Sequence, residues 1–375
     1  MASARVGDQN DRIGLYSVAD GREYRSLVRP GGSHAASPVL ATAIHPGGRL
    51  AALGHTSGGD GDLAQGVALF DLETGRGPVY IPFKTVTSAV NTHFDEAGNL
   101  FTNSFDGLFR WPVRRDTVRG DTVRPETAPP GRWTIGPPQR LPFQPSDCSV
   151  STSRDGRVIA QCMWLTGSMP GGGWILLPDS QTPRCVQPGS CTGACSVSPD
   201  GRWVAFTQPH LHPINIYDTE TCERVWQSPA NCGWHCRFSR DGRWLVTDVE
   251  GGRLYNVGTW EPGPQLGSGQ PQDMTADLAI LALPNGVYRL VEVPEGRELA
   301  RLEDPDQNCG PASFTPDGTK LVVAARDGVR VWDLRGIRRE LARLGLDWDA
   351  PPYPPADEKN DEPLDVVVDL GSLGP

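Results

Sequence analysis

The chain has 375 residues, a formal net charge of −10, 44 glycines and 35 prolines. An acidic chain is a poor non-specific ligand for nucleic acid or for an anionic membrane surface, so we expect neither as a partner. The sequence has no apolar run of about 18 residues and no secretion-signal pattern, so we expect a cytoplasmic protein. Nine cysteines at irregular spacing then predict thiols and no disulfides.

A short pattern recurs along the chain, with an Asp-Gly turn between two apolar strands. Its clearest copies are SRDGRVIAQ (153–161), SPDGRWVAF (198–206), SRDGRWLVT (239–247) and TPDGTKLVV (315–323). Asp-Gly between apolar residues is a strong hairpin signal, because glycine adopts positive φ without a steric clash. Each copy is followed by further apolar segments, so each unit predicts a small antiparallel sheet.

Seven residues at equivalent places of successive units give the length of the repeat. These residues are Asp71, Pro112, Pro178, Asp218, Asn256, Glu292 and Asp333. Their spacing averages about 44 residues, close to the roughly 40–45 of a four-stranded propeller blade. The sequence therefore predicts an all-β fold over residues 12–335: a seven-bladed β-propeller of four-stranded blades, with eight blades as the less favoured alternative.

The two ends of the repeat region complement each other. The last unit, 309–335, supplies only three strands, and REYRSLV (22–28) can pair with VRVWDLR (329–335) to close the ring. This leaves RIGLYSV (12–18) without a place, so an overhanging strand or a partial eighth blade both stay open.

Three segments fall outside the regular repeat. Residues 113–140 form an insertion, for which a small extra hairpin and a mobile loop are both possible. Residues 336–348 predict a short amphipathic helix with Ile337, Leu341 and Leu344 on one side. Residues 349–375 are proline-rich and acidic, so we expect most of this tail to be extended or disordered.

The segment around Val331, Trp332 and Asp333 resembles the third strand of WD-repeat proteins. More specifically, VWDLRGIRRELARLGLDWDAPPYPP (331–355) resembles the segment that closes the WD-repeat regions of bacterial serine/threonine protein kinases and related signalling proteins. The only Gly-His pair, Gly54-His55, lies in the wrong part of its unit, so most of the hydrogen-bonded tetrad of WD repeats is missing.

This resemblance implies a non-catalytic scaffold of a bacterial signalling or regulatory system, which binds a protein or peptide on its loop rim. We expect it to act as a monomer and without a cofactor. The sequence has no glycine-rich nucleotide loop and no HRD or DFG motif, so it does not predict phosphoryl transfer. The alternative is a propeller enzyme, a metal-assisted hydrolase or lyase with a site in the central channel, for which no catalytic residue is identified.

Four cysteines occupy equivalent positions in adjacent units. Cys191 and Cys195 recur as Cys232 and Cys236, and we expect Cys195 and Cys236 to face one another near the mouth of the channel. Four thiolates would suit a soft metal, but this spacing on an extended strand places the sulfurs about 13 Å apart. The pattern favours cysteine as a small apolar residue that fills tight space.

Loop residues are the best candidates for contact with a partner, because the inter-strand loops of a propeller present variable side chains on one rim. The candidates are Trp164, His210, His212, Trp234 and His235. His210 and His212 lack a third ligand in the sequence, so a metal role for them is the less favoured interpretation. Most other tryptophans lie in predicted strands, where we expect packing between blades.

Overall fold

The computed structural model of this chain describes residues 23–28, 39–55, 66–83, 91–115, 132–146, 148–163, 171–189, 193–208, 213–229, 234–248, 251–305, 307, 310–325, 328–355 and 362–373. Over these residues the fold is all-β, with one α-helix and one 3-10 helix. None of the described helices is long and apolar enough to cross a membrane.

Seven four-stranded antiparallel sheets, numbered I to VII in chain order, contain most of the strands. Sheet I contains β2 (Val39–Ile44), β3 (Leu50–His55), β4 (Gly66–Asp71) and β5 (Val79–Pro82). Sheet II contains β6 (Asn91–Phe94), β7 (Leu100–Ser104), β8 (Gly107–Trp111) and β11 (Gln139–Arg140). Sheet III contains β12 (Val150–Thr152), β13 (Ile159–Met163), β14 (Gly172–Leu176) and β15 (Arg184–Pro188), and sheet IV contains β16 (Cys195–Val197), β17 (Trp203–Phe206), β18 (Asn215–Asp218) and β19 (Arg224–Gln227).

Sheets V to VII follow the same plan. Sheet V contains β20 (Cys236–Phe238), β21 (Trp244–Thr247), β22 (Arg253–Asn256) and β23 (Pro262–Gln265). Sheet VI contains β24 (Gln270–Met274), β25 (Leu278–Leu283), β26 (Val287–Glu292) and β27 (Glu298–Glu303). Sheet VII contains β28 (Ala312–Phe314), β29 (Lys320–Ala325), β30 (Gly328–Asp333) and β1 (Tyr24–Val28).

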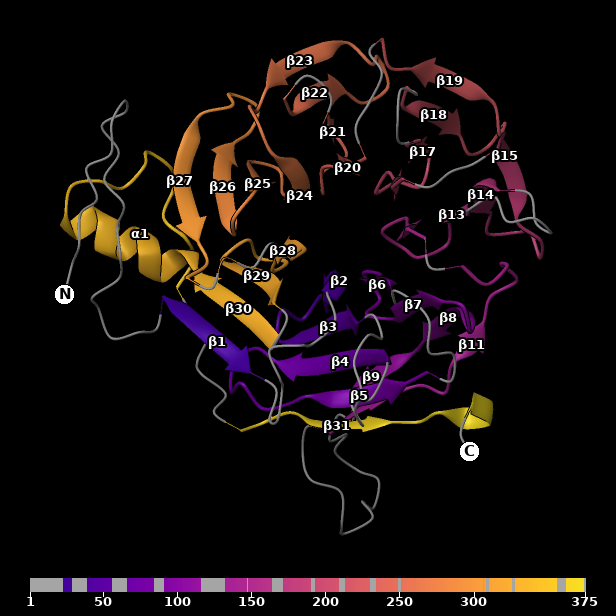
Figure 1. The fold of residues 1–375 in the computed structure, drawn as a ribbon, viewed down its shortest axis with the longest axis horizontal. Helices are drawn as coiled ribbons and strands as arrows, with labels where there is room; N and C mark the ends of the chain where they lie inside the picture. The colour runs from indigo at the N-terminus through magenta and orange to yellow at the C-terminus, as the bar shows by residue number, and fades with distance from the viewer. Residues whose placement is uncertain are drawn as a thin grey trace, which may run out of the picture.

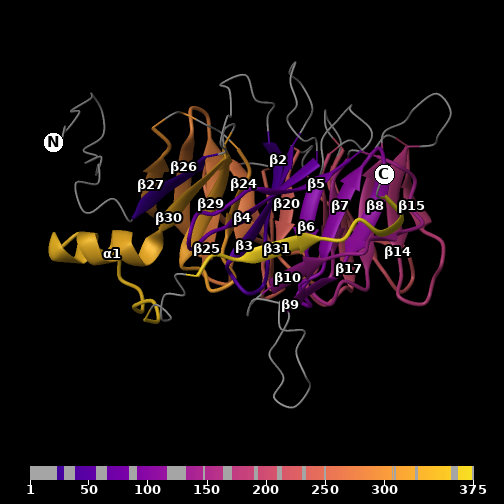
Figure 2. The ribbon, with the colours of Figure 1, turned by 90° about the horizontal axis from the view of Figure 1, so that it is seen from below.

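The sheets are arranged around a common centre, with the first strand of each innermost (Figure 1). Each innermost strand contacts the innermost strand of the next sheet, and β28 of sheet VII contacts β2 of sheet I. Seen from the side, the sheets form a disk (Figure 2). Repeated four-stranded sheets in this arrangement are consistent with a β-propeller.

The predicted Asp-Gly turns are present, and their side chains explain why the motif recurs. In sheet IV, Ser198 donates a hydrogen bond to the Asp200 carboxylate at 2.5 Å, and that carboxylate accepts one from the backbone amide of Arg202 at 3.1 Å. The Ser198 hydroxyl also accepts a bond from the amide of Trp203, which begins the next strand, at 2.9 Å. Gly201 has a φ of +76°, where a β-carbon would be strained. Sheets III, V and VII repeat this turn around Ser153, Ser239 and Thr315.

The apolar core lies between neighbouring sheets. Sheets VI and VII share a cluster that contains Tyr288 and Trp332, and sheets IV and V share one in which Trp203 and Trp226 pack with Trp260. These tryptophans therefore pack between sheets, as the sequence predicts. Because each sheet is covered by its neighbours, no single sheet has a core of its own.

The expected pairing between the two ends of the repeat region is also present. Strand β1 runs antiparallel to β30, with Tyr24 opposite Trp332 and Val28 opposite Gly328. Sheet VII thus combines one strand from the start of the chain with three from its other end. The segment RIGLYSV lies outside the described residues.

The α-helix that the described residues contain, α1 (Leu334–Arg343), starts and ends earlier than the predicted 336–348. The carboxylate of Asp333 caps it by accepting hydrogen bonds from two amides of the first turn, at 3.0 and 3.2 Å. Ile337 and Leu341 pack against the core of sheets VI and VII. Leu344, the C-cap residue, is 60% exposed, so its predicted place in the apolar stripe is wrong.

The insertion contains a hairpin, which is one of the two predicted alternatives. Strands β9 (Val113–Arg115) and β10 (Arg132–Ile135) are antiparallel and lie between β8 and β11 in the sequence. The tail adds β31 (Asp365–Val368), parallel to β10, and the 3-10 helix η1 (Gly371–Leu373) (Figures 1 and 2). The expectation of a mostly extended or disordered tail therefore missed a paired strand, whose alternating apolar residues pack against the disk.

Candidate functional site

Serine side chains on the innermost strands join one sheet to the next. The Ser151 hydroxyl on β12 accepts a hydrogen bond from the amide of Val197 on β16 at 3.0 Å. The Ser196 hydroxyl on β16 accepts one from the amide of Phe238 on β20 at 3.2 Å. These bonds connect sheets III, IV and V in sequence near the centre.

Two arginines extend these connections across more distant sheets. The Arg154 guanidinium donates to the backbone carbonyl of Arg240 at 2.7 Å. Arg240 in turn donates to the carbonyls of Phe314 and Thr315 and to the Asp273 carboxylate, at 2.8, 2.9 and 2.6 Å. Sheets III, V, VI and VII are therefore linked by side chains at the turn end of the innermost strands.

Charged side chains of two other sheets act on the pKa of His93, which lies on the innermost strand β6. They are Arg237 on β20 and Asp273 on β24. Burial lowers the pKa of His93 to about 4, the nearby Arg237 charge lowers it as well, and Asp273 opposes them. His93 is therefore neutral near pH 7, so one of its ring nitrogens can donate a hydrogen bond while the other accepts one.

The two described cysteines of the predicted quartet do not face one another. Cys195 packs with Cys162 between sheets III and IV, whereas Cys236 belongs to a separate cluster between sheets IV and V. The Cys195 thiol donates to the carbonyl of Ser149 at 3.3 Å. Burial raises the pKa of Cys195, but hydrogen bonds with Cys162 and Ser149 and the charge of Arg237 bring it below its ordinary value. Both residues fill space between sheets.

The loop before β20 holds Trp234, the more exposed of the two predicted rim residues that the structure describes. The Trp234 side chain is 43% exposed, while its backbone is held on both sides. Its amide donates to the Asp248 carboxylate at 2.8 Å, and its carbonyl accepts from the Ala194 amide and the Thr207 hydroxyl, each at 3.2 Å. The His235 amide and Nδ1 lie 3.2 and 3.4 Å from the same Asp248 oxygen. The loop thus presents an indole on a fixed backbone.

Of the predicted site residues, Trp234, His235, Cys195 and Cys236 are described. Trp234 and His235 lie together on the loop side, at the start of β20, as the sequence predicts for adjacent loop residues. The remaining predicted residues, Trp164, His210, His212, Cys191 and Cys232, lie outside the described residues. In the part of the chain that the structure describes, no group of three or more His, Cys, Asp or Glu residues could hold a metal ion.

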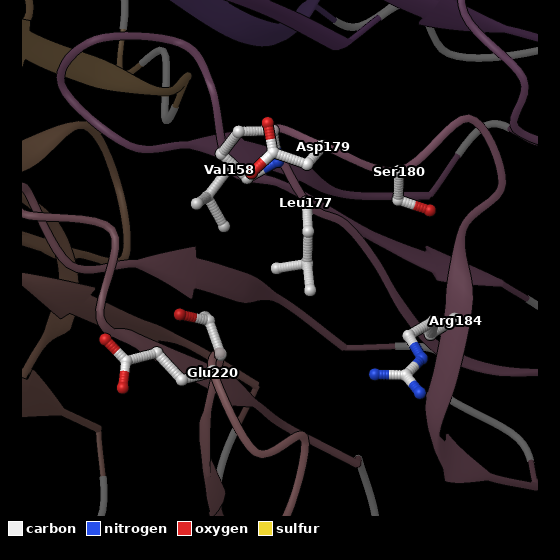
Figure 3. Close-up of a pocket in the computed structure, with 8 residues that line it drawn as sticks. Val158, Leu177, Asp179, Ser180, Arg184 and Glu220 are labelled. Atoms are coloured by element: carbon white, nitrogen blue, oxygen red, sulfur yellow. The ribbon is translucent and has the colours of Figure 1, made fainter.

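A shallow cavity of about 450 Å³ lies between sheets III and IV (Figure 3). It is formed at the ends of β14 and β18, opposite to the strand ends that carry Trp234. Figure 3 shows Leu177 and Val158 between Asp179 above and Glu220 below, with Arg184 at one side. Arg184 donates to the Cys222 sulfur at 3.4 Å. The lining offers separate charges of both signs around a small apolar centre.

Sequence reasoning missed Arg154, Arg240 and Asp248. A signal for the first two was present, since the residue before Asp-Gly is arginine in sheets III and V but proline in sheets IV and VII. Asp248 had no such signal, because its role depends on contact with the loop before β20, which lies 13 and 14 positions earlier in the sequence. A scan against protein-family models and a search of curated proteins each found no match for this chain.

Proposed function

We propose that the chain is a seven-bladed β-propeller of the WD-repeat kind that binds a protein or peptide, without catalysis, in the cytoplasm of a bacterium. Seven four-stranded sheets, the contact of β28 with β2 and the pairing of β1 with β30 support seven blades and a closed ring. The resemblance of residues 331–355 to signalling-linked WD-repeat regions supports a scaffold in a signalling or regulatory system.

The exposed Trp234 indole on its fixed backbone is the observation that carries the proposed binding role. Exposed tryptophan is enriched among the residues that contribute most to protein interfaces. Holding the loop in place before binding lowers the entropy lost on association. Asp248 and Thr207 hold it in this way, so Trp234 is the expected anchor and His235 a neighbouring contact.

Site-specific cross-linking tests this proposal. A photoreactive amino acid is placed at position 234 of the full chain, and the protein is illuminated in an extract of its own organism. The matched control carries the same group at position 225, because Val225 is 45% exposed but lies on the outer strand β19. We expect one protein adduct from position 234 that is absent from position 225. Excess wild-type chain added as competitor should remove this adduct, whereas excess Trp234→Ala chain should not. Equal labelling at both positions would contradict the proposal.

A channel-site enzyme is the second candidate. His93 favours it, because a neutral imidazole on an innermost strand, whose pKa responds to the charges of Arg237 and Asp273, can serve acid–base chemistry. Its test is a screen for turnover with the wild-type chain and with His93→Gln. Turnover that disappears in His93→Gln while folding is unchanged would favour the enzyme over the scaffold.

A further inference from the structure

One residue on each innermost strand lies immediately before the last residue of that strand. In β20 this residue is Arg237, which lies opposite Val246 of β21. The corresponding residues of the other sheets, in sheet order, are Ala43, His93, Ser151, Ser196, Asp273 and Ser313. Because the innermost strands surround the centre of the disk, these residues lie at one level around it and are called the central ring below (Figure 1).

Side chains of the central ring join one sheet to the next. The Ser151 and Ser196 hydroxyls and the Asp273 carboxylate each accept a hydrogen bond from an amide of the next innermost strand, and the Ser313 hydroxyl donates to a carbonyl of β2. Arg237 cannot accept such a bond, because a guanidinium has only donor groups. The corresponding amide of β24, that of Met274, donates to Asp273 at 2.8 Å instead. Arg237 therefore does not share the connecting role of its ring neighbours.

The Arg237 side chain is exposed, although Cys236 and Phe238 on either side of it are only 1% and 8% exposed. Within the ranges that the structure describes, its guanidinium makes no hydrogen bond or ion pair. Besides burial and hydrogen bonds, its charge lowers the pKa of Cys195 on β16, and besides burial it lowers that of His93 on β6. A charge that acts on groups of sheets II and IV lies toward the centre of the disk.

The other titratable groups of the central ring leave this positive charge uncompensated. The Asp273 carboxylate pairs with the Arg240 guanidinium at 2.6 Å and also accepts hydrogen bonds from two amides. Burial lowers the pKa of His93 to about 4, so its imidazole is neutral near pH 7. Arg237 thus places one solvent-accessible positive charge at the centre of a chain whose net charge is −10.

A guanidinium in this position suits a carboxylate ligand. Its planar fork can donate two parallel hydrogen bonds, one to each carboxylate oxygen. A single negative charge balances the charge of Arg237, whereas a second one would be repelled by the Asp273 carboxylate on the next strand. The charge balance therefore favours an organic acid with one carboxylate over a doubly charged anion such as phosphate.

We propose that Arg237 binds the carboxylate group of a small organic acid at the centre of the disk. The guanidinium pairs with both carboxylate oxygens, and the side chains that join the sheets keep their hydrogen bonds. An acidic side chain of a peptide carries the same group, so the experiment compares the two sources. The site does not rest on the binding role proposed for Trp234, because a small acid needs no contact with the rim.

Ligand-observed NMR with propionate tests the site on the full chain, with ionic strength held constant by sodium chloride. We expect saturable binding that Arg237→Met weakens at least about tenfold, the effect of losing a charge-assisted pair. Arg237→Lys keeps the charge but lacks the fork, so it should weaken binding by a smaller factor. Arg339→Met is the matched control and should bind like wild type, because Arg339 is exposed on α1, outside the central ring. Urea denaturation checks that the variants are folded.

Two further ligands identify the chemistry of the site. Inorganic phosphate should bind at least about threefold more weakly than propionate, because of the repulsion by Asp273. N-acetylglutamic acid α-amide carries the carboxylate of a peptide side chain. If it binds more tightly than propionate, the site is assigned to an acidic peptide and the proposal of a free acid is overturned. Absence of saturable propionate binding, equal binding of phosphate, or equal losses in Arg237→Met and Arg339→Met would also overturn it.

Discussion

The Asp71 carboxylate accepts a hydrogen bond from the Leu364 amide at 3.0 Å, although the two residues are 293 positions apart. Burial would raise the pKa of Asp71, but hydrogen bonds from Arg49, Thr74 and the amides of Leu364 and Glu73 lower it to about 2. One carboxylate at the end of β4 thus joins its own turn, the neighbouring arginine and the tail.

Replacing Asp71 should therefore cost both stability and tail binding. Asp71→Asn should lower the free energy of unfolding at pH 7 by about 2–4 kcal/mol, because it leaves Arg49 without its buried partner. Hydrogen exchange should rise at residues 364–370. The contribution of Asp71 is present above about pH 4 and is lost as pH falls toward 2, so the variant should lose less stability over that range. Glu73→Gln is the control, since Glu73 is 38% exposed and should change stability by under about 0.5 kcal/mol.

The hydrogen bonds that Ser151 and Ser196 accept from neighbouring sheets predict a second loss of stability. Ser196→Ala leaves the Phe238 amide without its acceptor and should cost about 1 kcal/mol in urea denaturation, and Ser151→Ala should cost a similar amount through Val197. Ser180→Ala is the control, because that hydroxyl donates only within its own turn. A loss below about 0.3 kcal/mol in both serine variants would show that these bonds do not hold the sheets together.

Arg240 and Arg243 make a matched pair in the turn that follows β20. Arg240→Ala removes bonds to sheets VI and VII and leaves Asp273 with one fewer partner, so we expect a loss of about 2–3 kcal/mol. Arg243 is 60% exposed and pairs with Asp241 in its own turn, so Arg243→Ala should cost under about 0.5 kcal/mol. Equal losses in thermal or chemical denaturation would contradict the role assigned to Arg240.

His45 predicts how stability changes in mild acid. It packs against Phe94 and Trp133 and accepts a hydrogen bond from the Gly47 amide, and burial lowers its pKa to about 4. Between pH 6.5 and 4 the unfolded chain binds a proton there that the folded chain excludes. The contribution of neutral His45 to the free energy of unfolding is therefore fully present above pH 6.5. It falls as pH is lowered, by about 1–2 kcal/mol at pH 5. In His45→Gln the decrease between pH 7.5 and 5 should be smaller, and an unchanged slope would refute this assignment.

The sequence predicted the sheets because their signals are local and repeated. The Ser-Pro-Asp-Gly turn at Ser198 and the apolar strand after it need no distant partner, and the pairing of β1 with β30 followed from a missing fourth strand. The tail strand was missed because proline and acidic composition outweighed the alternation in LDVVVDL. That alternation predicts a paired strand only when its partner, β10, is known, and β10 belongs to an insertion of irregular length.

The candidate site was less predictable than the fold. Sequence position identified Trp234 as a loop residue, but the fixed backbone depends on Asp248 and Thr207, which lie on other loops. Sequence position was also insufficient for Cys195 and Cys236. They occupy equivalent positions in adjacent units, which led to the prediction that they face one another near the mouth of the channel. Residues at equivalent places on successive sheets point into successive interfaces, so repetition separates them.

The central claim is that Trp234 anchors a protein or peptide partner. Its most direct test compares wild-type protein with Trp234→Ala and Val225→Ala in affinity capture followed by quantitative mass spectrometry, after denaturation shows equal stability. We predict that one partner is retained by wild type and Val225→Ala and reduced at least about tenfold by Trp234→Ala, the size of a typical interface hot spot. Retention of the same partners by all three proteins would contradict the claim.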